Sequence, residues 1–228
     1  MAKIETTSTE AYGTAMPVFE LANNAGAWKV KGTGKNYVSG IVPKTITQTR
    51  KDIKEWLSAQ QLATAAENAK RYPLYNLYAE IQKDLHLRSQ INNRMLKSLS
   101  RAFVIKDKNG KINQELTALL NNQNWVYGIN KAILETVYNG HSLVELNYEN
   151  EKLTTTLIPR QNVDPVNGLI FFDYTDDGKK VEYRKQKEYG SWLMELGDNK
   201  DLGLVNGCVP HVLFTRFAQS CGSEVAEI

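Results

Sequence analysis

The stretch that decides the fold is Asp84-Leu-His-Leu-Arg-Ser-Gln-Ile-Asn-Asn-Arg-Met-Leu-Lys-Ser-Leu99. Within it an apolar residue recurs at every fourth position, at Leu87, Ile91, Met95 and Leu99. This period is typical of one face of an α-helix. The carboxylate of Asp84 can accept the free amide hydrogens at the start of such a helix. We therefore predict Asp84 as the N-cap and an end at residues 98–100.

The helix is predicted to lead into a strand over residues 101–106, because Ala102-Phe-Val-Ile105 is apolar and partly β-branched. The Asn109-Gly110 pair then predicts a tight turn. Two helices are expected before Asp84. The first runs from residue 47 and ends before Tyr72-Pro73. The second carries an apolar face at helical spacing, made of Leu74, Leu77, Tyr78, Ile81 and Leu85.

After the turn, a short helix is predicted over residues 113–120 and a longer one from Asn124 to the Asn139-Gly140 pair, where either residue tolerates the left-handed conformation. The apolar face of the longer helix consists of Trp125, Ile129, Ile133, Leu134, Val137 and Tyr138. We expect this helix to form one core with the stretch described first, through Ile133, Val137, Ile91 and Leu99.

Beyond Gly140 the pattern changes to strands, predicted over residues 142–148, 153–158, 169–174, 181–185, 192–195 and 209–214. Asp177-Gly178 is the clearest hairpin signal. The predicted fold class is therefore α+β, with N-terminal helices followed by a mostly antiparallel β-sheet. Residues 218–228 look like the opening turns of a helix without a C-terminal cap, so we expect the chain to be truncated there.

Two parts of the chain differ in composition. Residues 1–45 are rich in Thr, Gly, Ala, Asn and Lys and show no sustained apolar period. We predict an extended or flexible arm that gains order only by lying on another surface. Residues 46–228 form the predicted α+β domain.

The composition excludes several classes of protein. A net charge of +3 over 228 residues is nearly balanced, whereas a protein dedicated to clamping duplex DNA is usually more basic. The sequence contains no run of 18 apolar residues, so no membrane span is predicted. The two cysteines, Cys208 and Cys221, have neither the spacing nor the neighbouring histidines of a zinc site, and we expect reduced thiols.

The sequence contains only incomplete matches to known catalytic and cofactor-binding motifs. Lys31-Gly-Thr-Gly-Lys35 lacks the first glycine and the final hydroxyl residue of a phosphate-binding loop. His86, His141 and His211 lie in separate predicted elements, so no metal pair forms. Asp173, Asp176 and Asp177 are interpreted as a solvated turn rather than a nuclease site. We predict no catalytic residue, no metal and no cofactor.

Basic residues are the remaining candidates for a site. Five of them lie close together after the predicted hairpin turn: Lys179, Lys180, Arg184, Lys185 and Lys187. They are suited either to contact nucleic-acid phosphates or to protect an exposed strand edge from pairing, and we favour the edge. Arg88 and Arg94, with Arg101, are expected to bridge to acidic groups within a subunit or across an interface.

Four pieces of the chain, in order and spacing, resemble the N-terminal part of Mu-type bacteriophage portal proteins. They are Asp84-Leu-His-Leu87 with Arg94, Trp125 with Tyr138-Asn-Gly-His-Ser-Leu-Val-Glu145, Ile158-Pro-Arg-Gln-Asn-Val163, and His211-Val-Leu-Phe-Thr-Arg-Phe217. The resemblance covers roughly residues 50–228.

The resemblance implies the wing-like α/β region of a subunit in a ring, commonly of twelve copies, at one vertex of the capsid. It implies a structural protein of the virion, assembled in the bacterial cytoplasm, that serves as a conduit for DNA during packaging and ejection. The implied partners are further copies of the chain, the capsid protein, the terminase motor, the head–tail connector and double-stranded DNA, with no membrane. Ring closure and most DNA contact are expected to need sequence beyond Ile228. The alternatives are another ring-forming head or tail adaptor and a small hydrolase or nuclease, which would need converging catalytic groups.

Overall fold

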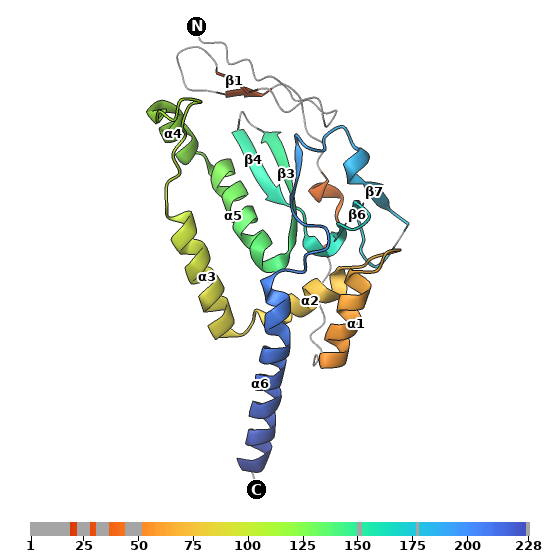
Figure 1. The fold of residues 1–228 in the computed structure, drawn as a ribbon. Coiled ribbons are helices and arrows are strands. Elements are labelled where there is room, and N and C mark those ends of the chain that lie inside the picture. Colours follow the sequence, from red (N-terminus) through yellow and green to blue (C-terminus); the bar gives the residue numbers. More distant parts are fainter. Residues whose placement is uncertain are drawn as a thin grey trace.

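The computed structural model describes residues 19–21, 28–30, 37–43, 52–149, 152–176 and 178–226 (Figure 1). Side chains are described within these ranges except at 19–21, 28–30, 149 and 220–226. Most of the predicted arm and Asp177 therefore lie outside the described residues. The α+β fold class is confirmed, because helices precede the main strands and every pair of strands among the described residues is antiparallel.

The helices are α1 (Ile53–Ala63), α2 (Tyr72–Ile81), α3 (Leu85–Leu99), α4 (Gln114–Asn121), α5 (Asn124–Asn139) and α6 (Leu204–Ala226). Short polar side chains cap three of them. The carboxylate of Asp84 accepts a hydrogen bond from the amide of Leu87 at 2.8 Å, which confirms the predicted start of α3. Asp52 and Asn113 cap α1 and α4 in the same way. Gly140 ends α5 with φ at 85°.

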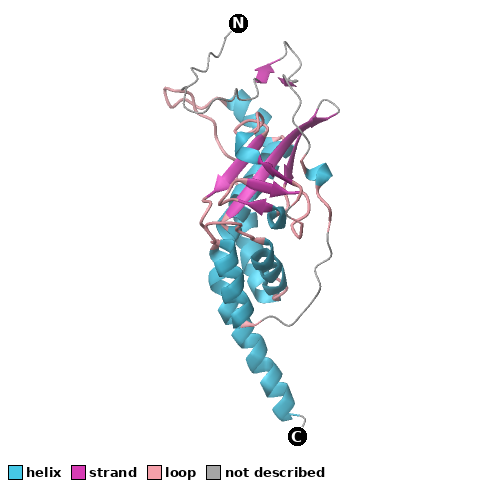
Figure 2. Cartoon of the chain, turned by 90° about the vertical axis from the view of Figure 1, so that its right-hand side faces the viewer, coloured by secondary structure: helices cyan, strands magenta, loops and turns pink. Residues whose placement is uncertain are grey.

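The strands form two small sheets of three strands rather than one larger sheet. In the first sheet, β3 (His141–Glu149) lies between β4 (Lys152–Leu157) and β8 (Leu193–Gly197). In the second sheet, β6 (Leu169–Phe171) lies between β5 (Val163–Asp164) and β7 (Lys180–Glu182). The backbones of β1 (Phe19–Leu21) and β2 (Trp28–Val30) pair separately. Figures 1 and 2 show the two main sheets above α1 and α2, with α6 extending downwards.

Two apolar cores hold these layers. The first joins α1, α2 and α6 and includes Leu74, Leu77, Ile81, Val205 and Val209. The second lies between the two sheets and includes Leu143, Ile158, Ile170, Tyr183 and Leu193. Alternate residues of β3 point to opposite faces, so Leu143 enters the second core while Ser142 contacts α5 on the other face. The central strand is therefore covered on both sides.

The segment of residues 37–43 is attached to the second core. Tyr37 is buried there, and its backbone amide and that of Val38 donate hydrogen bonds to the buried Glu145 carboxylate at 2.5 and 3.2 Å. Further along, the amide of Val42 donates to the Phe172 carbonyl. Burial raises the pKa of Glu145, and the two amides only partly oppose that effect. The division of the chain at residue 45 stays a prediction.

The strand predicted over residues 209–214 is wrong, because these residues belong to α6. Val205, Val209 and Leu213 recur at every fourth position and all three are buried in the first core. Helical packing against α1 and α2 therefore decides this segment over its local β-branched composition. Residues 218–226, expected as the start of a helix, continue the same one.

The strand predicted over residues 101–106 is also wrong. Only Lys106 forms a bridge, with Ile112, around the confirmed Asn109-Gly110 turn. The amide of Ile105 donates to the hydroxyl of Thr117 in α4 instead of to another strand. A strand needs a partner for its backbone groups, and α4 takes that place here.

The face of α5 that contacts the sheet differs from the predicted one. Ile133 and Val137 are 45% and 51% exposed, whereas Ala132 and Thr136 are buried against β3. The sheet approaches so closely that a Cβ on Gly128 would lie 2.9 Å from Thr155. Small residues therefore face the sheet, and the single core expected for Ile91, Leu99, Ile133 and Val137 does not form. In α3 no residue is fully buried.

Candidate functional site

The most connected polar group in the described chain is the carboxylate of Glu195 on β8. It accepts hydrogen bonds from the hydroxyls of Tyr183 and Tyr189 at 2.6 and 2.7 Å, and His141 Nε2 lies 3.0 Å away. Arg184 donates from Nε at 3.1 Å and from Nη2 at 2.6 Å. We call these five residues the Glu195 centre. They tie β3 and β8 to the segment that follows β7.

The electrostatics of this centre favour one fixed protonation state. Burial alone would raise the pKa of Glu195, but hydrogen bonds from His141, Arg184 and the two tyrosines outweigh it and hold the pKa far below its usual range. Burial lowers the pKa of His141, so the ring is neutral near pH 7 and Nε2–H donates to the carboxylate. Burial, together with the carboxylate, also raises the pKa of Tyr183. Each of the four donor side chains is hydrogen-bonded to Glu195, which is the arrangement of a structural network rather than of a reactive one.

A second network adjoins this centre and is organised by Arg160. Its guanidinium donates to the His141 carbonyl, to the Ser142 hydroxyl at 2.8 Å and to the Glu135 carboxylate at 3.1 Å. The hydroxyl of Thr136 also donates to Ser142. Arg160 follows the Ile158-Pro159 step, so this loop, the turn after α5 and the start of β3 meet at one point.

A third arginine fixes the start of α6. Arg71 is 1% exposed, and it donates to the carbonyls of Asn199 and Asp201 at 2.5 and 2.8 Å. The Tyr78 hydroxyl donates to the Leu202 carbonyl beside it. The loop passes so close to Gly140 that a Cβ there would lie 2.3 Å from the Asp201 carbonyl oxygen. The direction of α6 is therefore set by α2 and by the end of α5.

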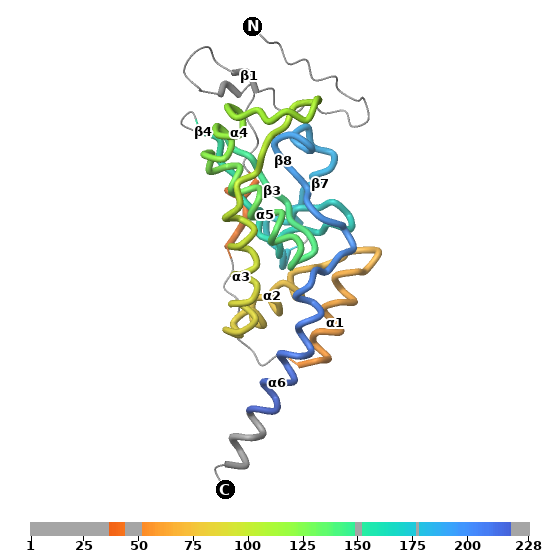
Figure 3. Tube along the Cα trace, turned by 60° about the vertical axis from the view of Figure 1, so that its left-hand side comes forward, coloured from red at the N-terminus to blue at the C-terminus, as the bar shows by residue number. Residues whose placement is uncertain are grey.

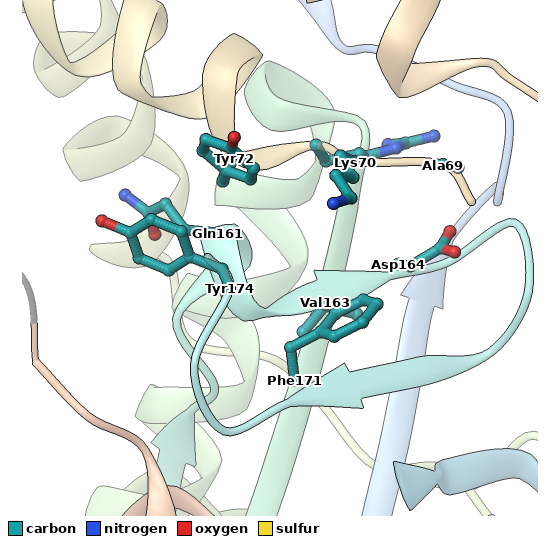
Figure 4. Close-up of a pocket in the computed structure, with 9 residues that line it drawn as sticks. Ala69, Lys70, Tyr72, Gln161, Val163, Asp164, Phe171 and Tyr174 are labelled. Carbon is teal, nitrogen blue, oxygen red and sulfur yellow. The ribbon is translucent and has the colours of Figure 1, made fainter. Parts of the chain in front are cut away.

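A small pocket lies between α2 and the second sheet (Figure 4). Its lining includes Tyr72, Val163, Asp164, Phe171 and Tyr174, and the rings of Tyr72 and Tyr174 stack with centroids 5.0 Å apart. The cavity volume is about 10 Å³, which is room for about one water molecule. A small-molecule site usually needs about 300–1,000 Å³. A larger depression of about 470 Å³, lined by Glu67, Asn167 and Lys180 among others, is open to solvent.

The described residues contain neither a metal-binding cluster nor a helix that could span a membrane. Within them, no group of three His, Cys, Asp or Glu side chains is placed to hold a metal ion. None of the helices that the structure describes combines the length and apolar character needed to cross a membrane. Lys31–Lys35 lies outside the described ranges.

The predicted basic residues occupy two separate places. Lys180 lies on β7 and Arg184 and Lys185 lie on the 3-10 helix Tyr183–Lys185, with exposed Lys179 and Lys187 on either side. β7 is at the edge of its sheet. The side chain of Arg184 is engaged by Glu195 and by the Pro165 carbonyl, and Lys185 pairs with Glu182. Arg88 and Arg94 lie on α3, where both are exposed.

The residues that sequence reasoning missed are Glu195, Tyr183, Tyr189 and Arg71. A charged residue inside the apolar run Trp192-Leu-Met-Glu-Leu196 was the available signal for Glu195, because an inward-facing charge in a strand needs partners. No local pattern marks Arg71, whose partners lie about 130 residues along the chain.

Comparison with known proteins gives the family. Residues 75–228, more than half of the chain, match the family model described as the portal protein of Mu bacteriophage. The chain belongs to this portal protein family. No curated protein and no solved structure matches it.

The family match contains all four pieces that carry the resemblance, and two of them meet in the Arg160 network. Tyr138–Glu145 supplies His141 and Ser142, and Ile158–Val163 supplies the arginine that binds both. The portal family is one of structural proteins and virion components. Its sequence pattern in these two pieces therefore corresponds to a junction that positions helix and sheet.

Proposed function

We propose that this chain is a subunit of a homo-oligomeric portal ring at one vertex of the phage capsid. In the ring it serves as part of the conduit for DNA during packaging and ejection, and as a docking site for the packaging motor and the head–tail connector. The chain itself is structural, and nucleotide hydrolysis belongs to the separate motor. The observation that carries the proposal is the family match over residues 75–228.

Exposed apolar residues on two different flanks support ring assembly. One flank is formed by α3 and α5 and exposes Leu85, Leu96 and Tyr127. The other is formed by α1 and α6 and exposes Leu57, Phe214 and Phe217. Figure 3 shows α3 and α1 on opposite sides of the molecule. A ring requires two such different faces, because each subunit meets its neighbour head to tail.

The outer part of α6 is the strongest of these surfaces. Val205, Val209 and Leu213 bury one side of the helix, but Phe214 and Phe217 are 71% and 57% exposed. Monomeric proteins seldom leave aromatic side chains grouped in this way without a partner. In our proposal these two rings pack against the neighbouring subunit.

Antibody labelling of assembled phage heads tests the proposed location. An epitope inserted in the exposed turn at Asn109-Gly110 should bind gold-labelled antibody at a single vertex of each head, with unmodified phage as the control. Label spread over the whole shell would contradict the proposal. Label on the tail alone would favour the alternative of a tail adaptor.

Sedimentation velocity tests the proposed contact of α6. The chain should show weak, concentration-dependent association that Phe214→Ser with Phe217→Ser removes. Ile112→Ser is the matched control, since Ile112 is also an exposed apolar residue but lies in the loop before α4. Association that survives the double substitution, or a monomer at every concentration, would remove α6 from the interface.

A further inference from the structure

The positive charge of the chain is concentrated in one segment. Residues 85–111 contain seven Lys and Arg residues and one acidic residue, so this segment carries six positive charges in excess. The whole chain carries only +3, and the rest of it is therefore net negative. The near-neutral total conceals this asymmetry, which belongs to α3 and the loop that follows it.

All seven cationic side chains are exposed. Arg88, Arg94, Lys97 and Arg101 lie on or directly after α3. Lys106, Lys108 and Lys111 lie in the loop before α4. Among the described residues none of the seven makes an ion pair, whereas Arg160, Arg184 and Arg216 all do. These seven charges therefore hold no part of the described fold together by ion pairing.

One exposed side of α3, which we call its outward face, carries only side chains that can donate hydrogen bonds. Gln90, Arg94, Lys97 and Arg101 follow one another at i, i+4, i+7 and i+11, which places them along one side of the helix. The helix contains no Asp or Glu. Its line of Leu87, Ile91, Met95 and Leu99 is partly buried towards the rest of the chain.

We propose that this face of α3, with the lysines of the following loop, binds the phosphate backbone of nucleic acid. Amide, guanidinium and ammonium groups are among the side-chain groups that contact phosphates, and they do so without reading the base sequence. Arg94 and Arg101 are separated by about 10 Å along the helix axis. One strand of a duplex presents a phosphate about every 3.4 Å along its axis, so the face spans about three phosphates.

An acidic protein surface is the rival partner for the same cations. The centre of a protein–protein interface is normally apolar, with charged residues at its rim. The exposed Leu85 and Leu96 of α3 are eleven positions apart, which is about three turns, so they share one side of the helix. Arg94 and Lys97 lie on a different side. The cationic face lacks an apolar centre, and this favours phosphate.

Fluorescence anisotropy with a labelled duplex, and with one of its strands alone, tests the proposal over a series of salt concentrations. The test variant is Arg94→Gln with Lys97→Gln and Arg101→Gln. The control removes three exposed charges from the β7 edge by Lys179→Gln, Lys180→Gln and Lys187→Gln. In the test variant we expect weaker binding and a plot of log affinity against log salt that is shallower by about three units. The control should keep most of the slope.

Three results would overturn the proposal: no binding of the native chain at low salt, an equal loss of slope in both variants, or an unchanged slope in the test variant. The first means that the chain does not bind nucleic acid, the second leaves only net charge as the cause of binding, and the third places the phosphate contacts elsewhere. If the test variant instead loses self-association in sedimentation while its DNA affinity is unchanged, the face is a protein interface. The proposal does not depend on ring formation, so its failure and that of the portal ring are read in separate measurements.

Discussion

The Glu195 centre and the outward face of α3 use the same residue types in opposite ways. In the centre, one carboxylate takes hydrogen bonds from an arginine, two tyrosines and a histidine, all within 3.1 Å. On α3, Arg88, Arg94 and Lys97 are exposed, and the helix itself contains no Asp or Glu. A buried charge is tolerable only when it is paired, so the centre holds the fold together. An exposed, unpaired charge contributes little to the fold and remains available to a partner.

The largest effect on stability is expected from a substitution in the Glu195 centre. Glu195→Gln removes the charge that Arg184 needs and turns an amide towards groups that are all donors. Because the side chains of Glu195 and Arg184 are 13% and 33% exposed, we expect the free energy of unfolding to fall by up to about 3–5 kcal/mol, the cost of breaking a fully buried ion pair. Urea denaturation measures it. Glu182→Gln is the control, because that carboxylate forms a surface pair with Lys185 and should cost about 1 kcal/mol or less.

The pH dependence of stability sharpens the same comparison. The pKa of Glu195 is lowered in the folded protein, and so is that of His141. The unfolded chain therefore binds more protons at both sites as the pH falls. Stability should decline first below about pH 6.5, where His141 is protonated in the unfolded chain, and more steeply below about pH 4.5, where Glu195 follows. In Glu195→Gln the steeper part should be reduced, and an unchanged profile would contradict the assignment.

How far the sequence predicted these structures depends on whether the signal was local. The cap at Asp84 and the stop at Gly140 were predicted because each involves groups only a few residues away. Residues 209–214 were misassigned because β-branched composition competed with a helical period that only the packing of α6 decides. The Glu195 centre gathers residues separated by up to 54 positions, and no short pattern could group them.

The run from Lys179 to Lys187 shows the same limit in a single segment. Sequence reasoning treated its five basic residues as one set. The structure engages Arg184 with Glu195 and leaves Lys187 exposed three residues later. Which cation is structural depends on a carboxylate supplied by another strand.

A smaller effect is expected at the start of α3. Asp84→Ala removes the acceptor of the Leu87 amide and should destabilise the chain by about 0.5–2 kcal/mol. Thermal unfolding monitored by circular dichroism measures the loss. Asn92→Ala, an exposed change within the same helix, serves as the control. Equal behaviour of the two variants would mean that the cap adds nothing to α3.

Buried and exposed apolar side chains should also differ in how they respond to the loss of one methyl group. Ile170 is fully buried in the second core, and Ile170→Val should cost about 0.5–1.5 kcal/mol. Ile133→Val on the exposed side of α5 should lie within about 0.5 kcal/mol of the native chain. Chemical denaturation of both variants compares them directly. A cost at Ile133 as large as that at Ile170 would restore the packing of α5 that the sequence suggested.

The smallest effect is expected at the exposed side of the comparison. Arg94→Gln with Lys97→Gln and Arg101→Gln should change the free energy of unfolding by no more than about 0.5 kcal/mol. Two small terms oppose each other. Lys97 lies in the last turn of α3, where a cation is favoured by the helix dipole, and its loss costs a few tenths of a kcal/mol. Removing three of seven neighbouring like charges relieves repulsion by a similar amount.

Arg184→Gln, a single change of the same kind in the Glu195 centre, should cost more than the triple substitution, and denaturation of both variants shows whether it does. If the triple variant is the less stable of the two, the α3 cations are structural after all, and a loss of nucleic-acid binding in that variant would no longer identify a binding face.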